Sequence, residues 1–469
     1  MKHPPIHSTL LIVAAGLLAG CTVGPNYHKP TVPVPTAYHG PNDNPQNPEA
    51  QAASIADLPW WQVFQDSVLQ DLIRRTLKQN YDLQTATERI AQARAQLMVT
   101  RSNQYPQLSA NGSAVDERTF QGFPAKTRFG TYAADATFQL DLFGQLRRAT
   151  ESARAQLLAT EYAQKTEILT LVSDVASDYF ALLSLDLQLQ IARDTIKTQE
   201  DAVKLTEHRL DHGVATKLDV LQAKQVLDTA NAQVPELQRQ IGLEEDALSI
   251  LLGDYPHNIT RGLRLVDQRL PPEVPAGLPS SLLARRPDIS QAEQNLISAN
   301  AQIGVAKAAF FPQISLTGTG GGAVGRSTVF SSIVNSNIGT WGGTAQLMQP
   351  IFTAGRLRGN LHSAESQQRQ SLIAYKQAIQ GAFMDVSDAL ISYQKYYEVR
   401  KAQEDTVQDL SNSVSTSLKR YRGGITTYLE VLDNQRSLFS AQLTLAQDRG
   451  NEFQSLVQLY KALGGGWRQ

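Results

Sequence analysis

Two acidic side chains in the second half of the chain have a spacing that would place both charges on one helix face. Residues 419–433 read KRYRGGITTYLEVLD, and Glu430 stands three residues before Asp433. On a helix such a pair shares one face, so the two carboxylates would project side by side. Thr427 and Glu430 also fit a capping box, in which both side chains bond to the backbone at a helix start. The residue types therefore allow two roles for Glu430, a member of a charged cluster or a helix cap.

Nearly the same turn occurs earlier in the chain. Residues 208–222 read HRLDHGVATKLDVLQ, with Gly213 where the later stretch has Gly424. Each glycine suits the left-handed backbone that ends an incoming helix. Thr216 and Asp219 form a second capping-box pattern, which would open the outgoing helix. The two stretches predict two helical hairpins with matching turns.

Other chemistry finds little support in the sequence. His208 and His212 have a helical spacing that can bind a metal, but no third ligand is evident, so solvated histidines are favoured. Neither the phosphate-binding pattern GxxxxGK[ST] nor the nucleophile pattern GxSxG occurs. We therefore expect no catalytic residues, no metal and no cofactor apart from an N-terminal lipid.

Composition excludes further classes of protein. The formal net charge is −1 over 469 residues, which gives no basic surface for a nucleic acid. The chain has one cysteine, Cys21, so it has no intrachain disulfide.

The N-terminal residues are typical of a secreted lipoprotein. Residues 1–20 combine an early lysine, a short apolar run and small residues, as a secretory signal peptide does. The sequence LAGC ending at Cys21 resembles the lipobox of bacterial lipoproteins, in which the cysteine is lipidated and becomes the new N-terminus. Thr22 at the next position fits sorting to the outer membrane. An ordinary signal with a chance cysteine is the alternative.

The rest of the chain is one unit written twice. Residues 144–253 align with 355–464, and YPQLSANGS at 105–113 aligns with FPQISLTGT at 311–319. A repeat this long implies two structurally equivalent halves. The expected organisation is a signal peptide at 1–20, a Pro-rich arm at 21–60, a first repeat at 61–253, a linker at 254–287, a second repeat at 288–464 and a tail at 465–469.

Each half contains long stretches with a seven-residue apolar repeat. In the first half this seam includes Val175 and Leu182, and in the second Ile379 and Val386. A repeat of 3.5 residues per turn is typical of supercoiled helices. The predicted long helices span about 145–211, 217–252, 355–422 and 427–463.

Shorter stretches alternate apolar and polar residues with a period of two. They lie at about 106–118, 128–142, 312–325 and 340–352. One apolar and one polar face is the pattern of a transmembrane barrel strand. Four strands cannot close a barrel, and open edges are not tolerated in lipid, so several chains must share one barrel. A homotrimer would supply about twelve strands.

Several motifs resemble one known family. They are CTVGPNY (21–27), LPSSLLARRPDISQAE (278–293), FFPQISLTG (310–318), YRGGITTYLEVLDNQRSL (421–438) and LYKALGGGW (459–467). Together they resemble the lipoprotein branch of the outer-membrane efflux factors, the TolC-like channels, over nearly the whole mature chain. The resemblance implies a mainly α-helical homotrimer with a twelve-stranded outer-membrane β-barrel and a long periplasmic α-helical barrel. It also implies a periplasmic adaptor protein and an inner-membrane pump of the resistance-nodulation-division (RND) type as partners.

The resemblance implies a role for the repeated turns as well. Leu429, Glu430 and Asp433 match the constriction of the closed pore, where threefold symmetry would gather up to six carboxylates. The links that hold the tip closed match Tyr421 with Asp219 as its acidic partner, and Arg420. Gly213 and Gly424 lie where the adaptor would dock.

The expected function is therefore a passive outer-membrane duct for small toxic compounds, gated at its periplasmic tip and not an enzyme. Two alternatives stay open at this point. One is an outer-membrane duct for type I protein secretion, which shares the architecture. The other is a non-channel periplasmic coiled-coil lipoprotein, although such a protein would need no lipid-facing strands.

Overall fold

The structure is a computed structural model that describes residues 22–40, 54–119, 125–269, 279–329 and 332–467. The signal peptide expected at 1–20 and the lipidation site Cys21 lie outside the described residues. So do parts of the expected arm, linker and tail, at 41–53, 270–278 and 468–469.

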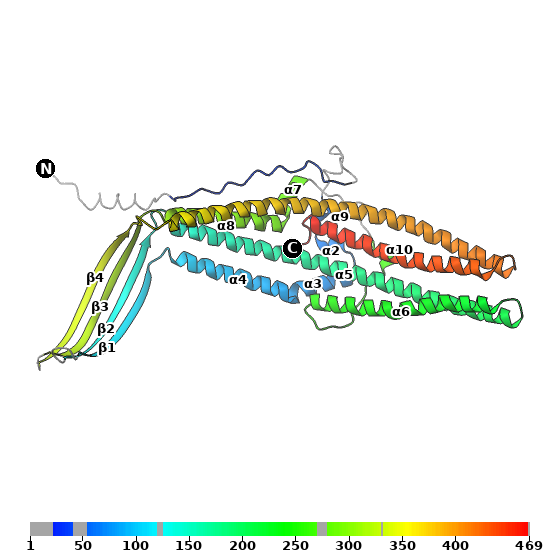
Figure 1. Cartoon of the computed structure of the whole chain (residues 1–469), viewed down its shortest axis with the longest axis horizontal. Helices are drawn as coiled ribbons and strands as arrows, with labels where there is room; N and C mark the ends of the chain where they lie inside the picture. The colour runs from blue at the N-terminus through cyan, green and yellow to red at the C-terminus, as the bar shows by residue number, and fades with distance from the viewer. Residues whose placement is uncertain (1–21, 41–53, 120–124, 270–278, 330–331, 468–469) are drawn as a thin grey trace. The chain divides into compact units, whose positions relative to one another are not determined.

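The elements follow the same order twice (Figure 1). Helix, strand, strand, long helix and shorter helix recur as α4, β1, β2, α5, α6 and as α8, β3, β4, α9, α10. Their bounds are α4 Tyr81–Ser102, β1 Gln107–Thr119, β2 Ala125–Leu140, α5 Gln145–Asp211, α6 Lys217–Leu251, α8 Pro287–Ala308, β3 Gln313–Val329, β4 Ser332–Met348, α9 Arg356–Arg422 and α10 Tyr428–Ala462. Shorter elements lie before α4 and between α6 and α8, namely η2 Ile55–Asp57, α2 Trp60–Val63, α3 Ser67–Gln79, η3 Leu265–Asp267 and α7 Pro279–Arg285.

The chain divides into two compact units that cut across the repeat. One unit comprises Met1–Thr31, Arg89–Glu161 and Gln291–Lys376, and the other Val32–Glu88, Tyr162–Ser290 and Gln377–Gln469. Each unit takes segments from both halves because the strands of the two halves pair with each other, and so do their helices. The repeat is therefore a property of the sequence order and not of the compact units.

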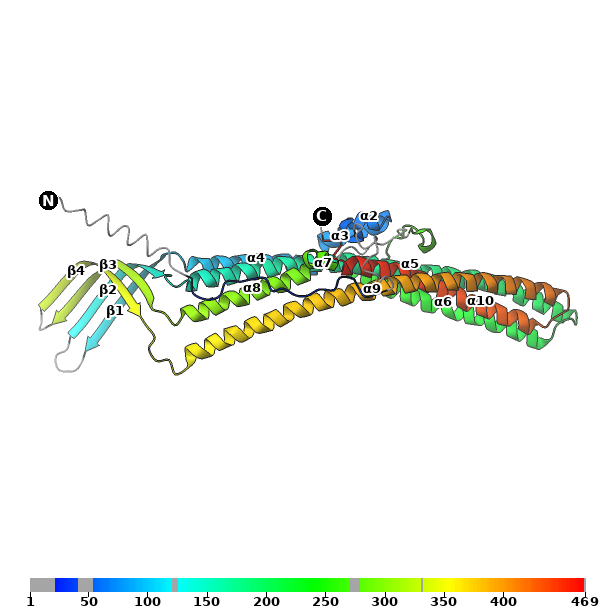
Figure 2. The ribbon, with the colours of Figure 1, turned by 90° about the horizontal axis from the view of Figure 1, so that it is seen from above.

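The first unit contains one antiparallel sheet with the order β1-β2-β3-β4 (Figure 2). Leu108, Ala136, Gly318 and Gly343 pair across it in one row, and Ser109, Asp135, Thr319 and Gly342 pair in the next. Successive residues of a strand point to opposite faces, so the first row belongs to an apolar face and the second to a polar face. On the polar face, the Asp135 carboxylate accepts hydrogen bonds from Asn111 and Thr319.

The strands differ from their predicted ranges mainly where pairing, and not alternation, decides. β4 begins at Ser332 and not at 340, because residues 332–339 continue the pairing with the end of β3. It ends at Met348 and not at 352, where Pro350 lacks the N–H that a ladder needs. Strand pairing also extends β3 to Val329, which pairs with Ser332, and makes β2 begin at Ala125, which pairs with Thr119.

In the second unit, the long helices pack as hairpins along the predicted seams. Val175, Leu182, Ile379 and Val386 are each at most 2% exposed, as the seven-residue repeat predicts. One helix of the described chain, α5, is long and apolar enough to cross a membrane by length and composition. Because 61% of its most apolar window is buried inside the protein, we assign that window to the helical core.

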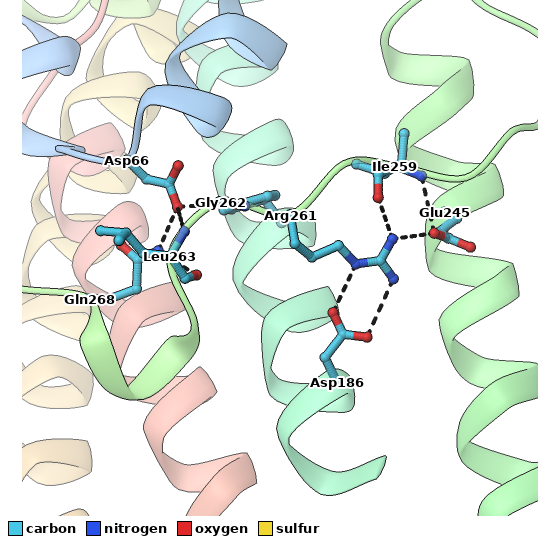
Figure 3. Close-up of polar contacts among 9 residues, drawn as sticks. Asp66, Asp186, Glu245, Ile259, Arg261, Gly262, Leu263 and Gln268 are labelled. Atoms are coloured by element: carbon cyan, nitrogen blue, oxygen red, sulfur yellow. Dashed lines mark hydrogen bonds and ion pairs between the residues drawn. The ribbon is translucent and has the colours of Figure 1, made fainter. Parts of the chain in front are cut away.

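A polar clamp fixes the segment that follows α6 (Figure 3). The Asp66 carboxylate, at the start of α3, accepts hydrogen bonds from the N–H of Leu263 at 2.9 Å and from Gln268 Nε2 at 2.7 Å. The Arg261 guanidinium bonds Asp186 of α5 at 2.8 Å and also reaches Glu245 of α6. Residues 261–268 are thereby tied to α3, α5 and α6 at once.

Candidate functional site at the hairpin turns

The two turns have the same backbone. Gly213 and Gly424 each have a φ of +69°, in the left-handed region. At the first turn, Gly213 N donates to Leu210 O and Val214 N to Arg209 O, at 2.9 and 2.8 Å. The second turn has the same pair of hydrogen bonds, from Gly424 N to Tyr421 O and from Ile425 N to Arg420 O. Both helices therefore end in a Schellman motif, for which glycine is the favoured residue.

The two turns differ in how their outgoing helices begin. Thr216 and Asp219 form the predicted capping box, with Asp219 N donating to Thr216 Oγ1 and Thr216 N to the Asp219 carboxylate. The capping box that the sequence allows at Thr427 and Glu430 is absent, because the Thr427 side chain makes no cap bond.

The Glu430 carboxylate is held by other groups instead. Arg420 Nη1 lies 3.1 Å from one carboxylate oxygen, and the Thr426 hydroxyl donates to the other. At the positions equivalent to Thr426 and Glu430, the first turn has Ala215 and Asp219. With no hydroxyl at 215 to compete, the acidic side chain of the first turn remains on its cap.

Tyr421 is buried at the base of the second turn, with 6% of its surface exposed. The Arg209 guanidinium carbon lies 4.6 Å from the centre of its ring, a cation–π contact that joins α5 to α9. The hydroxyl has no hydrogen-bond partner among the described residues. Burial raises the pKa of Tyr421, the nearby Arg209 charge lowers it, and the Asp219 charge raises it again.

The predicted bond between Tyr421 and Asp219 does not form within this chain. The Asp219 carboxylate is occupied by the backbone and hydroxyl of Thr216, at 2.8 and 2.9 Å. Arg209 occupies the position near Tyr421 instead. Of the residues expected to close the tip, the structure brings Arg420 to Glu430 and leaves Tyr421 and Asp219 apart.

An apolar cluster joins the two hairpins behind the turns. Its members come from α5, α6, α9 and α10 and are all nearly inaccessible to solvent. They are Val203, Ala223, Val226, Tyr421, Tyr428, Val431 and Leu432. Directly behind the turns, the contact between the hairpins is therefore mainly hydrophobic, and Arg209 adds a cation–π contact to it.

The outer surface of both turns is apolar as well as charged. Leu429 is 49% exposed, and Asp433 is exposed without an ion pair or hydrogen bond to the described residues. Ile425 and Val214, equivalent in the repeat, are 73% and 63% exposed. Among the described residues, nothing covers these side chains.

The histidines before the first turn interact with each other. The rings of His208 and His212 stack at 4.3 Å, and His212 Nδ1 lies 2.8 Å from the His208 carbonyl oxygen. Within the described residues, no cluster of three or more His, Cys, Asp or Glu side chains could hold a metal.

Sequence reasoning missed Arg209 and Thr426. Both could have been found by comparing the turns position by position, since Arg209 aligns with Arg420 and Ala215 with Thr426. The alignment shows which side chains differ, but it does not show which partner each will choose.

Comparisons with known proteins match this architecture. The family model described as outer membrane efflux protein matches residues 72–254 and 278–465. The cation efflux system protein CusC of Escherichia coli O6:H1 is 37% identical over 96% of this chain and 97% of its own. The toluene efflux pump outer membrane protein TtgC of Pseudomonas putida is 38% identical over 97% of this chain and 95% of its own.

A solved structure gives the same result. The open state of the MtrE outer membrane channel of Neisseria gonorrhoeae superposes with a TM-score of 0.83 at 31% identity, covering 96% of this chain and 99% of its own. Channels of this family are TolC-like ducts that are not enzymes, form trimers, and pair with adaptor proteins and inner-membrane RND pumps. The non-channel lipoprotein is thereby excluded, and the chain belongs to the outer membrane efflux protein family.

Proposed function

We propose that three copies of this chain form one passive efflux duct whose gate is the second hairpin turn. In this assembly the β1 and β4 edges of neighbouring chains pair to close a barrel of about twelve strands. The open edges of the four-stranded sheet support this arrangement. Each chain would comprise a signal peptide, a Pro-rich arm, two repeats joined by a linker, and a short tail.

The proposal of a gate at the second turn is supported by one observation. The equivalent acidic side chains Asp219 and Glu430 have different hydrogen-bond partners. Asp219 is committed to its helix cap, whereas Glu430 is held by Arg420 and Thr426 across the turn. Side chains of the Arg420–Glu430 pair are 48% and 37% exposed, so an outside group can compete for either. Exposed ion pairs contribute only about 0–1 kcal/mol, so a docking partner can replace this one.

Threefold symmetry gives the gate its charge. Leu429, Glu430 and Asp433 lie along the first turns of α10, and three copies would gather six carboxylates around a narrow opening. A ring of carboxylates favours cations over anions. Breaking the Arg420–Glu430 pair would free both groups and loosen the turn, a two-state element biased by binding.

The exposed residues of the turns fit the adaptor contact. Val214 and Ile425 beside the two turn glycines offer small apolar anchors to a helical partner. Cys21 carries the lipid that anchors the arm to the inner leaflet of the outer membrane.

Cargo selection belongs elsewhere in the system. CusC and TtgC are nearly equally similar to this chain, yet CusC is named for the efflux of cations and TtgC for the efflux of toluene. Drugs and other small toxic compounds chosen by the pump would pass without specific recognition. No observation in this chain favours protein secretion.

The test is the conductance of the purified trimer in a planar bilayer, wild type beside a Glu430→Ala, Asp433→Ala variant. Wild type should give small, cation-selective currents, because carboxylates line the narrowest point. The variant should give larger currents with less selectivity.

An Asp405→Ala, Asp409→Ala variant is the matched control. It removes the same charge from exposed positions of α9 away from the turn and should conduct like wild type. Equal conductance and selectivity in all three proteins would refute the carboxylate gate. The absence of any current from well-folded trimers in all three would refute the duct.

A further inference from the structure

The first described residues of the chain are fixed at the base of the sheet. Val23 N donates to the Phe143 carbonyl oxygen at 3.0 Å, just beyond the end of β2. Thr22 lies directly against Gly144, where an added Cβ would come within 2.8 Å of its methyl group. Gly24 packs backbone to backbone on Gly304 of α8, with no room for a Cβ.

Polar bonds continue this attachment along the arm. Arg148 Nη2 donates to Asn26 Oδ1 at 2.7 Å, and Asn300 Nδ2 to the Pro25 carbonyl oxygen at 3.0 Å. Arg148 is 4% exposed, so the arm covers it. The arm is therefore fixed at the base of the sheet from Thr22 onward, and Cys21 directly precedes Thr22 in the sequence.

The apolar face of the same sheet has a groove above this point. A hollow of about 440 Å³ crosses β2, β3 and β4 and is lined mainly by Ala136, Phe138, Leu316, Gly318 and Gly343. The hollow is shallow and open to the outside of the sheet. Gly318 and Gly343 have no atom within 4 Å of where a Cβ would stand, so the floor of the groove is open.

Cross-strand pairs form an apolar path from the strand ends to this groove. Leu140 pairs with Ile314, Phe138 with Leu316, and Ala136 with Gly318, all on one face. From Leu140 to Ala136 is about 13 Å along the strand. One leaflet of a bilayer core is about 15 Å deep, so an acyl chain rooted at the strand ends reaches the groove.

We propose that an acyl chain carried by Cys21 of the same polypeptide occupies this groove. The inference rests on the lipidation included in the proposed function. Lipid tails are as apolar as the groove, so the hydrophobic effect alone does not favour occupancy. The covalent tether does, because it gives this acyl chain a far higher local concentration at the groove than any free lipid.

The occupied groove would have a functional consequence. The acyl chain would connect the N-terminal arm to β2, β3 and β4 and form one surface with them on the lipid-facing side. The anchor would then act as part of the barrel wall and not only as an attachment to the membrane.

The experiment uses the full-length protein in its own membrane. Cells are grown with a palmitate analogue that carries a terminal diazirine, irradiated, and the purified trimer is digested for mass spectrometry. The expected product is an intrachain crosslink between the Cys21 peptide and the peptides around 136, 318 or 343.

Two leucine substitutions on the same face of the sheet, one inside the groove and one outside it, test whether the acyl chain occupies the groove. Gly343→Leu fills the open floor and should abolish the crosslink. Ala114→Leu adds the same side chain to the same face of β1, outside the groove, and should keep it.

Three outcomes would overturn the proposal. A Cys21 peptide without fatty acid removes the lipidation itself, and with it this inference. A lipidated Cys21 that crosslinks only to phospholipid or to other surfaces removes the groove occupant alone. Equal labelling of the groove peptides in a Cys21→Ser variant would assign the groove to free membrane lipid.

Discussion

At the scale of single residues, identical types do different work according to their competitors. Thr216 caps its helix and Thr427 does not, although both stand three residues before an acid. The Thr426 hydroxyl and Arg420 account for the difference, because both bind the Glu430 carboxylate that would otherwise return to the cap. A capping-box pattern in the sequence therefore predicts the cap only where no nearer donor exists.

Two half-buried acids away from the turns should make stability depend on pH. Burial raises the pKa of Asp178 in α5 to about 6, with Asp174 adding to the shift. Burial and the Asp178 charge raise the pKa of Glu244 in α6 to about 7. Both groups are most easily accommodated when protonated. Their contribution to stability should therefore be fully present below about pH 4, decrease as pH rises from 4 to 7, and stay constant above pH 7.

Replacing one of these acids should remove part of that dependence. Asp178→Asn should raise the melting temperature at pH 8 and change it little at pH 4.5, since a raised pKa of two units corresponds to at most about 3 kcal/mol. Asp211→Asn, at an exposed position of the same helix, is the control and should change neither value. A uniform shift at both pH values would contradict the assignment.

At the scale of elements, the seven-residue apolar repeat predicted the positions of the long helices. The four long helices lie within one residue of their predicted ranges, because the heptad seam and the turn glycines mark both their course and their ends. The strand ends were less predictable, since residues 332–339 alternate weakly and are recruited by pairing with β3. The Arg209–Tyr421 contact was not predictable either, because it joins helices 212 residues apart.

The two hairpins also differ in what they bury. Glu452 of α10 has 1% of its side chain exposed and pairs with Arg400 of α9, while Glu404 joins Arg400 to Arg449. The equivalent positions of Arg400 and Glu452 in the first half are Leu189 and Ile241, both buried. The second hairpin thus has an ionic network where the first has apolar packing.

Replacing the ionic network by the first-half residues should show a strong coupling. Arg400→Leu alone should lower stability by about 3–5 kcal/mol, because it leaves Glu452 buried without its partner. Arg400→Leu with Glu452→Ile should recover most of the loss. Thermal unfolding followed by helical circular dichroism measures both.

Lys395→Leu serves as the comparison, since its pair with Glu398 is exposed and should contribute at most about 1 kcal/mol. Additive losses in the double variant would show that Arg400 and Glu452 act independently, against the network described above.

At the scale of the whole molecule, one chain leaves too much apolar surface uncovered to stand alone. Ile351 and Phe352, between β4 and α9, are 95% and 88% exposed, and Ile373 and Met384 on α9 are 56% and 60% exposed. Contiguous exposed apolar groups mark contact surfaces. We expect neighbouring chains to cover those on α9.

A charge on this face of α9 should therefore act on assembly. Ile373→Glu should prevent trimer formation while leaving the helix content unchanged, because a buried unpaired carboxylate is unfavourable only in the interface. Multi-angle light scattering in detergent gives the oligomeric mass. Gln367→Glu, at an exposed position about 120° around the helix from Ile373, should remain trimeric. A trimer of unchanged stability in Ile373→Glu would place the interface elsewhere.

The unequal turns also bear on how such a chain can evolve. Because the hairpin is duplicated, the two copies can diverge. The copy that keeps its helix cap stabilises that end of the molecule, and the other copy no longer needs its own cap. If the second turn is the gate proposed above, a change as small as alanine against threonine at one position helps to separate a fixed turn from one that opens. The duplication supplies redundancy at the level of structure, and a single hydroxyl turns that redundancy into a division of labour.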